Sequence, residues 1–117
     1  SELFETLRKE ELTKDLSKAA LETISIILYR SGATRSEINF IRGVNSSYIL
    51  RNLEIRGLVE RDMHKTDGRL NIYKPTLELL SFLGVGSAEE LPEFQKVRDT
   101  LNQKLSGNEE IKNGDNT

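Results

Sequence analysis

The chain has 117 residues, no cysteine and a formal net charge of −2. This length predicts one domain with a modest core plus some trailing sequence. The missing cysteines exclude a disulfide framework and thiol chemistry, and they are typical of a reducing cytosol. No apolar run approaches the roughly 20 residues of a membrane-spanning helix, so no membrane role is expected.

The charges are unevenly distributed along the chain. Residues 34–74 carry eight basic and five acidic side chains, whereas residues 106–117 are net negative. The positive excess in the middle of the chain is mild. A dedicated DNA-binding protein is usually more basic, because phosphate contacts supply most of its affinity.

Two helices are predicted in the first third of the chain. Apolar residues at near-helical spacing in residues 1–12 predict a short helix or the frayed remnant of a longer one. Ser17 can then cap a second helix, with Leu16 packing on Leu21 across the cap. An apolar stripe predicts its core-facing side: Ala20, Leu21, Ile24, Ile27 and Leu28.

The centre of the chain predicts a helix-turn-helix. Thr34 and Glu37 form a capping-box pattern at the start of one helix. Gly43 is placed to end that helix, because glycine tolerates the positive φ of this position. Asn45 is the expected N-cap of the next helix, and Gly57 ends it. Two short helices joined by a glycine-containing turn are typical of this motif.

The second of these helices divides into two faces. Its inward face is apolar: Ile49, Leu50 and Leu53. Tyr48, Arg51 and Ile55 fall on the opposite side, with Ser47 and Glu54 beside them. A DNA-reading helix would present more Arg, Lys, Asn or Gln. Apolar residues rimmed by polar ones favour a protein partner. Two alternatives stay open, which are DNA contact and packing of these residues under the rest of the fold.

A hairpin is predicted next, because Val59 to Met63 alternate with polar residues and a second alternation follows Asp67-Gly68. Lys65 and Arg69 place basic charge near its tip. Ala33 can add a short extended segment. Three helices followed by a hairpin predict a mainly α winged helix-turn-helix, with a three-helix core, a β-hairpin wing and extra C-terminal helices.

The last third of the chain predicts the extra helices. Thr76 caps a short helix after Pro75, and Ser87 with Glu90 makes a second capping box. A final helix over residues 93–105 carries Phe94 on its apolar side. Residues 106–117 contain almost nothing apolar, which predicts a disordered tail.

No constellation of catalytic, cofactor-binding or metal-binding residues is found. His64 is the only histidine and has no convergent ligands around it in the sequence. Glu89 and Glu90 are explained by capping, and no glycine-rich phosphate loop follows a strand. An enzymatic function and a bound cofactor are therefore not expected.

Several separated motifs resemble one bacterial family. Residues 16–29 are similar to "LSxAALETLAIIAY", residues 34–43 to "TRAEIExIRG", and residues 44–50 to "VNSSGVL". Gly68, Arg69 and Tyr73 match "GRPxxY". These patterns belong to the second winged-helix domain of segregation and condensation protein B (ScpB), and the match covers residues 16–92.

The chain also departs from that family at several positions, one of which is Lys74-Pro75 in place of the small residues that usually follow the tyrosine. Leu70 replaces a proline, Tyr48 stands where glycine is frequent, and Ile55 stands where a charged residue is frequent. The resemblance divides the chain into a segment 1–15, a winged-helix domain 16–92, a helix 93–105 and a tail 106–117. Residues 1–15 would then hold the last helix of a preceding winged-helix domain, through which the family forms homodimers.

The resemblance implies a non-enzymatic scaffold. Members of this family bind the kleisin ScpA, which associates with the SMC ATPase in bacterial condensin, in the cytoplasm at the nucleoid. The expected partner surface contains Tyr48, Arg51, Ile55, Phe82 and Phe94. For such a scaffold, DNA contact is expected to be weak or indirect. The alternative is a winged-helix DNA-binding transcriptional regulator. Its candidate DNA-contacting residues are Ser47, Arg51, Lys65 and Arg69.

Overall fold

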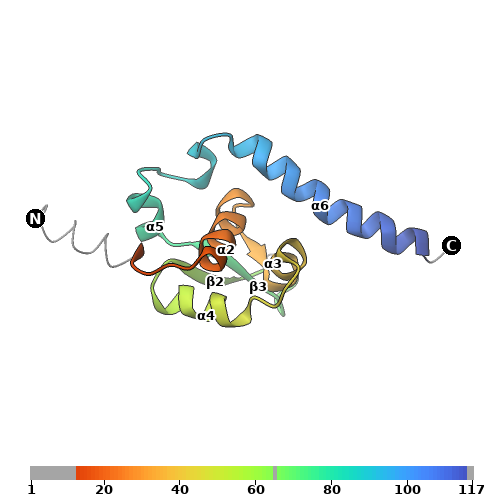
Figure 1. Cartoon of the computed structure of the whole chain (residues 1–117), viewed down its shortest axis with the longest axis horizontal. Helices are drawn as coiled ribbons and strands as arrows, with labels where there is room; N and C mark the ends of the chain where they lie inside the picture. Colours follow the sequence, from red (N-terminus) through yellow and green to blue (C-terminus); the bar gives the residue numbers. More distant parts are fainter. Residues whose placement is uncertain (1–12, 65, 116–117) are drawn as a thin grey trace, which may run out of the picture.

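The computed structural model describes residues 13–64 and 66–115, with side chains described as far as Gly107. The expected helix in residues 1–12 lies outside the described residues. The elements follow in this order: α2 (Lys18–Tyr29), β1 (Ala33–Thr34), α3 (Arg35–Arg42), α4 (Ser47–Ile55), β2 (Val59–Met63), β3 (Asn71–Pro75), α5 (Leu77–Phe82), a 3₁₀ turn η1 (Ala88–Glu90) and α6 (Phe94–Asp115). Figure 1 shows α2, α3 and α4 gathered beside the small sheet.

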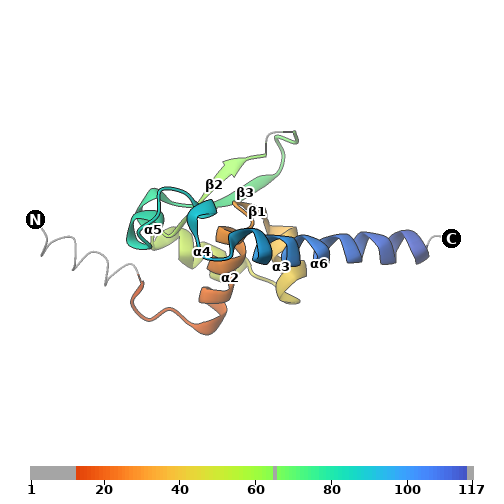
Figure 2. The same ribbon diagram turned by 90° about the horizontal axis from the view of Figure 1, so that it is seen from above.

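The core lies where the three helices meet the sheet. Its fully buried apolar residues come from four places in the chain: Ile27 of α2, Ile38 of α3, Leu50 and Leu53 of α4, and Leu58 just before β2. The hairpin of β2 and β3 extends away from this core (Figure 2). The predicted mainly helical winged-helix fold is therefore confirmed. One detail of the α2 stripe is wrong, because Leu21 is 52% exposed.

The helix-turn-helix forms with one correction at its turn. Thr34 Oγ1 accepts the Glu37 N–H at 3.2 Å, and Glu37 Oε1 accepts the Thr34 N–H at 2.9 Å, which is the predicted capping box. Gly43 ends α3 in the left-handed region, at φ 78°. Asn45 is not the N-cap of α4. Its Oδ1 accepts the Ser47 N–H at 2.8 Å, which closes a local turn, and α4 therefore begins one residue later than predicted.

The sheet has three antiparallel strands in the order β1-β3-β2. The predicted extended segment at Ala33 is its third strand, and it pairs with Tyr73 of β3. Tyr73 in turn lies opposite Arg61 of β2, so the two side chains share one face of the sheet. This register places Arg61 and Tyr73 side by side, where they line one cavity together with residues of α4.

The tip of the wing differs from the predicted tight Asp-Gly turn. Gly68 does not adopt a positive φ, and β2 and β3 are joined by a longer loop. The side chain of His64 organises this loop, because its Nδ1 accepts the N–H groups of Thr66 and Asp67 at 3.2 and 3.1 Å. A side-chain acceptor thus replaces the backbone pattern that the dipeptide favours.

Helix α6 packs on α2 and α3, on the side of the core opposite to α4 (Figure 1). Phe94 stacks on Tyr29 with ring centroids 6.0 Å apart. Lys104 Nζ donates to the carbonyl of Ile41 at 2.5 Å. The helix also continues to Asp115 rather than ending at residue 105. Glutamate and lysine are good helix formers, so a segment with almost no apolar residues can still extend a helix.

Candidate functional site

The outer face of α4 is open to solvent. Tyr48 is 79% exposed and Ile55 is 74% exposed, whereas Leu50 and Leu53 are buried. The predicted division of the helix into two faces is confirmed. The alternative that Tyr48 and Ile55 pack beneath the rest of the fold is wrong, because α6 covers the opposite side of the core.

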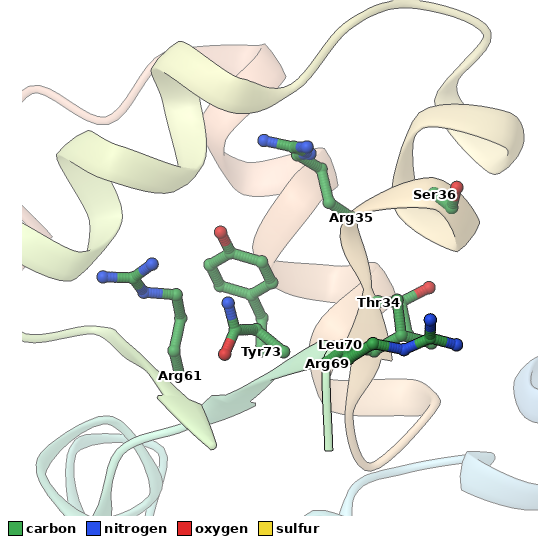
Figure 3. Close-up of a pocket in the computed structure, with 8 residues that line it drawn as sticks. Thr34, Arg35, Ser36, Arg61, Arg69, Leu70 and Tyr73 are labelled. Atoms are coloured by element: carbon green, nitrogen blue, oxygen red, sulfur yellow. The ribbon is translucent and has the colours of Figure 1, made fainter. Parts of the chain in front are cut away.

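A groove separates α4 from the wing. One part of it is a cavity of about 390 Å³, lined by Arg35, Ser47, Arg51, Glu54, Ile55, Arg61 and Tyr73. The adjoining part, of about 310 Å³, lies nearer the wing loop and is lined by Thr34, Arg35, Ser36, Arg61, Arg69, Leu70, Asn71 and Tyr73 (Figure 3). Arg35, Arg61 and Tyr73 line both parts. We call the two parts together the wing groove.

The arginines of the wing groove differ in their pairing. Arg61 Nε lies 3.1 Å from Glu54 Oε2, and Arg69 Nε lies 3.2 Å from Asp67 Oδ1. The hydrogen bonds from Arg69 hold the pKa of Asp67 below its ordinary value. Arg35 and Arg51 form no ion pair with any residue that the structure describes. The groove therefore has positive charge that is not neutralised within the described part of the fold.

Tyr73 forms the floor of the wing groove. Its side chain is held on the sheet between Ala33 and Arg61, and only 8% of the residue is exposed. The hydroxyl points into the space between Arg35 and Arg61 (Figure 3). No hydrogen bond joins this hydroxyl to another described residue. The ring is therefore buried while the hydroxyl remains available to a group that enters the groove.

The structure separates the residues that the sequence grouped together. Arg51 and Ile55 line the wing groove and Tyr48 lies beside them on α4, but Phe82 is half-buried on α5 and lines neither part. Phe94 is 7% exposed and belongs to the core, so its side chain is not available on the surface of the domain. Its stacking on Tyr29 is the physical reason.

The candidate DNA contacts are also divided. Ser47 and Arg51 lie in one part of the groove and Arg69 in the other, where its side chain is 91% exposed. Lys65 lies outside the described residues.

Sequence reasoning missed Arg35, Arg61 and Tyr73 as site residues. The sequence did contain a signal for Arg35, because a positively charged side chain in the first turn of a helix interacts unfavourably with the helix dipole. Tyr73 and Arg61 could be placed together only once the strand register was known.

Neither a metal site nor a membrane span is found in the described part of the chain. No group of three His, Cys, Asp or Glu side chains there is arranged to hold a metal ion. No helix among those residues is long and apolar enough to cross a membrane.

Comparison with known proteins gives one consistent family. The model for the segregation and condensation complex subunit ScpB matches residues 1–94. Segregation and condensation protein B of Lactococcus lactis subsp. cremoris (strain MG1363) is 40% identical over 114 residues, which are 97% of this chain and 61% of that protein. The chain thus spans about three fifths of the length of the curated relatives that it matches.

Solved structures that resemble this chain include a ScpB protein and also a protein that shares only the fold. The crystal structure of ScpB from Mycobacterium tuberculosis is 33% identical, with a TM-score of 0.56, and the match covers 62% of this chain and 45% of that one. A probable transcriptional regulator from Pseudomonas aeruginosa is 15% identical, with a TM-score of 0.56, over 94% of this chain and 86% of that one. The second likeness concerns the fold alone. By its sequence, the chain belongs to the ScpB family of segregation and condensation complex subunits.

Proposed function

We propose that the chain is a non-enzymatic scaffold module of the segregation and condensation complex. It binds the kleisin ScpA through the wing groove and the outer face of α4, and it acts on the SMC ATPase only through that kleisin. It works at the nucleoid, and homodimers of the whole protein form through an amino-terminal winged-helix domain. The observation that carries this proposal is the exposure of Tyr48 and Ile55 beside a groove with two arginines that form no ion pair with a described residue.

The chemistry of this surface is that of a protein interface. Tyrosine and arginine are enriched among the residues that carry most binding energy. A large exposed tyrosine also costs little conformational entropy when it is ordered at an interface. Ile55 adds exposed apolar surface, which is typical of a protein interaction site when polar residues surround it. These three residue types occur together on the outer face of α4, while its inner face holds the helix in place.

The test is a calorimetric titration with ScpA of the same organism. The unmodified chain is expected to bind near equimolar ratio. Ile55→Asp should weaken binding by about 10- to 100-fold, because it places a charge in an apolar contact. Leu77→Asp is the matched control, since Leu77 is 79% exposed on α5 and lies outside the wing groove. Absence of binding by the unmodified chain would overturn the proposal.

The DNA-binding alternative is tested with the same protein. A fluorescein-labelled duplex of random sequence would be titrated at two salt concentrations. We expect weak binding at low salt only, because Glu54 neutralises Arg61 inside the groove and repels phosphates. Tight binding with a steep salt dependence, lost in Arg51→Gln and Arg69→Gln, would favour the regulator instead.

A further inference from the structure

We propose that the wing groove contains a carboxylate-binding subsite, formed by the Tyr73 hydroxyl and the guanidinium groups of Arg35 and Arg51. The subsite receives an Asp or Glu side chain of the bound segment, next to an apolar side chain of that segment. This inference rests on the proposed function and names the chemistry of the segment that the groove selects.

The first argument is the unpartnered hydroxyl. Tyr73 is more than nine-tenths buried, yet its hydroxyl points into the groove and bonds to no described residue (Figure 3). The hydroxyl oxygen is not among the buried unpartnered atoms of the described residues, so it is open to the groove and free to bond to a ligand atom there. Because arginines line the cavity on either side, that atom is an acceptor rather than a donor.

The second argument is the position of Arg35. It is the first residue of α3, directly after the N-cap Thr34, where the positive end of the helix dipole disfavours a cation. Folding gains nothing from a positive charge there. Its guanidinium lines both parts of the groove and forms no ion pair with a described residue. A bound carboxylate would satisfy both the arginine and the helix terminus.

The third argument decides between a peptide and a nucleic acid. A phosphate backbone would bring repeated charges past Glu54, which lines the same cavity. A peptide can present a single carboxylate and place the next side chain elsewhere. Ile55 lines that cavity too, and Tyr48 is exposed beside it. One acidic side chain next to one apolar side chain matches this arrangement of charge and apolar surface.

The test uses ScpA titrated against variants of the groove. Tyr73→Phe removes one oxygen and should weaken binding by about 3- to 10-fold. Arg35→Gln and Arg51→Gln should each weaken it by about 10-fold, and less at high salt. Lys96→Gln is the control for loss of one charge, because Lys96 is exposed on α6, on the far side of the core. Circular dichroism would establish that each variant is folded.

The partner side completes the experiment. Each Asp and Glu of the ScpA segment that binds would be changed to Asn or Gln. One of these ScpA variants should bind the unmodified chain more weakly than unmodified ScpA does. The same ScpA variant should bind Arg35→Gln almost as well as unmodified ScpA does, because two residues in direct contact are energetically coupled. If ScpA binds and the Tyr73, Arg35 and Arg51 variants bind equally well, the subsite is overturned and the proposed function stands. If the unmodified chain binds duplex DNA and not ScpA, both are overturned.

Discussion

The two sides of this domain use the same residue types in opposite ways. On the α6 side, Phe94 is buried against Tyr29, and Arg30 pairs with Glu37 at 2.6 Å. On the α4 side, Tyr48 is exposed and Arg51 forms no ion pair with a described residue. An aromatic residue or an arginine is therefore not by itself a sign of a binding site. What distinguishes the open side is that two of its arginines, Arg35 and Arg51, form no ion pair with a described residue.

Two arginines of α3, Arg42 and Arg35, also differ in their roles. Arg42, whose side chain is 8% exposed, donates to Ser46 Oγ at 2.9 Å and lies 3.5 Å from Glu22. It holds the turn before α4 in place. Arg35, on the same helix, forms no ion pair with any residue in the described part of the chain. The comparison can be tested by stability measurements on pairs of matched variants, from the largest expected effect to the smallest.

The largest effect is expected for Phe94→Ala. Removing a buried ring from the contact of α6 with α2 should lower the free energy of unfolding by about 3 kcal/mol, measured by urea denaturation. Ile55→Ala on the open side should change it by less than about 0.5 kcal/mol. Equal effects of the two variants would mean that the two sides do not differ as described.

A smaller loss is expected for Arg42→Ala. The variant leaves the buried Ser46 hydroxyl without its donor and removes packing, which should cost about 2 kcal/mol. Arg35→Ala is the matched control, and it should be neutral or slightly stabilising because it removes a cation from a helix N-terminus. Thermal unfolding of both variants would check this, and a destabilised Arg35→Ala would show that Arg35 has a structural role.

Loss of the capping box should have a moderate effect. Thr34→Ala removes the hydroxyl that accepts the Glu37 N–H, and should cost about 1 kcal/mol. Ser36→Ala, at an exposed position two residues further on, should cost much less. Chemical denaturation of the two variants would distinguish them. Similar stabilities would show that the cap bond contributes little to α3.

The smallest effect concerns pH. The Glu89 pKa lies below its ordinary value of 4.5, chiefly through hydrogen bonds from its own backbone N–H and from Ser31 Oγ. A carboxyl group with a lowered folded-state pKa stabilises the fold above pH 4.5, and this stabilisation is lost as the pH falls through the lower value. Because Glu89 is exposed and screened by water, we expect at most about 0.5 kcal/mol.

The measurement is the stability of Glu89→Gln relative to the unmodified chain, between about pH 7 and about pH 3. The difference should be present at neutral pH and should shrink on acidification below pH 4.5. A difference that grows on acidification would have the wrong sign for this explanation.

Local patterns predicted the parts of the fold that depend on neighbouring residues. The capping box at Thr34, the left-handed Gly43 and the cap at Thr76 all formed as expected, since each involves atoms within four residues. The outward face of α4 followed from helical spacing alone. The Asp67-Gly68 pattern correctly predicted a hairpin but not the conformation of its loop. The loop differs because the His64 side chain accepts hydrogen bonds from two backbone N–H groups.

The groove could not be predicted in the same way. Its floor depends on the pairing of Tyr73 with both Ala33 and Arg61, and these residues are far apart in the sequence. The burial of Phe94 depends likewise on the path that brings α6 back across α2 and α3. Helical spacing showed that Phe94 lies on an apolar side, but it did not show which surface that side meets.

The capping box of α3 has a further consequence for how the domain opens. Glu37 caps the helix and also accepts from Arg30, whose guanidinium in turn donates to Asn102 of α6. Detachment of α6 would therefore loosen the first turn of α3, from which Arg35 enters the wing groove. Amide hydrogen exchange should reveal this as one cooperative unit: the Thr34 and Glu37 amides would exchange together with the start of α6 and not with the wing loop.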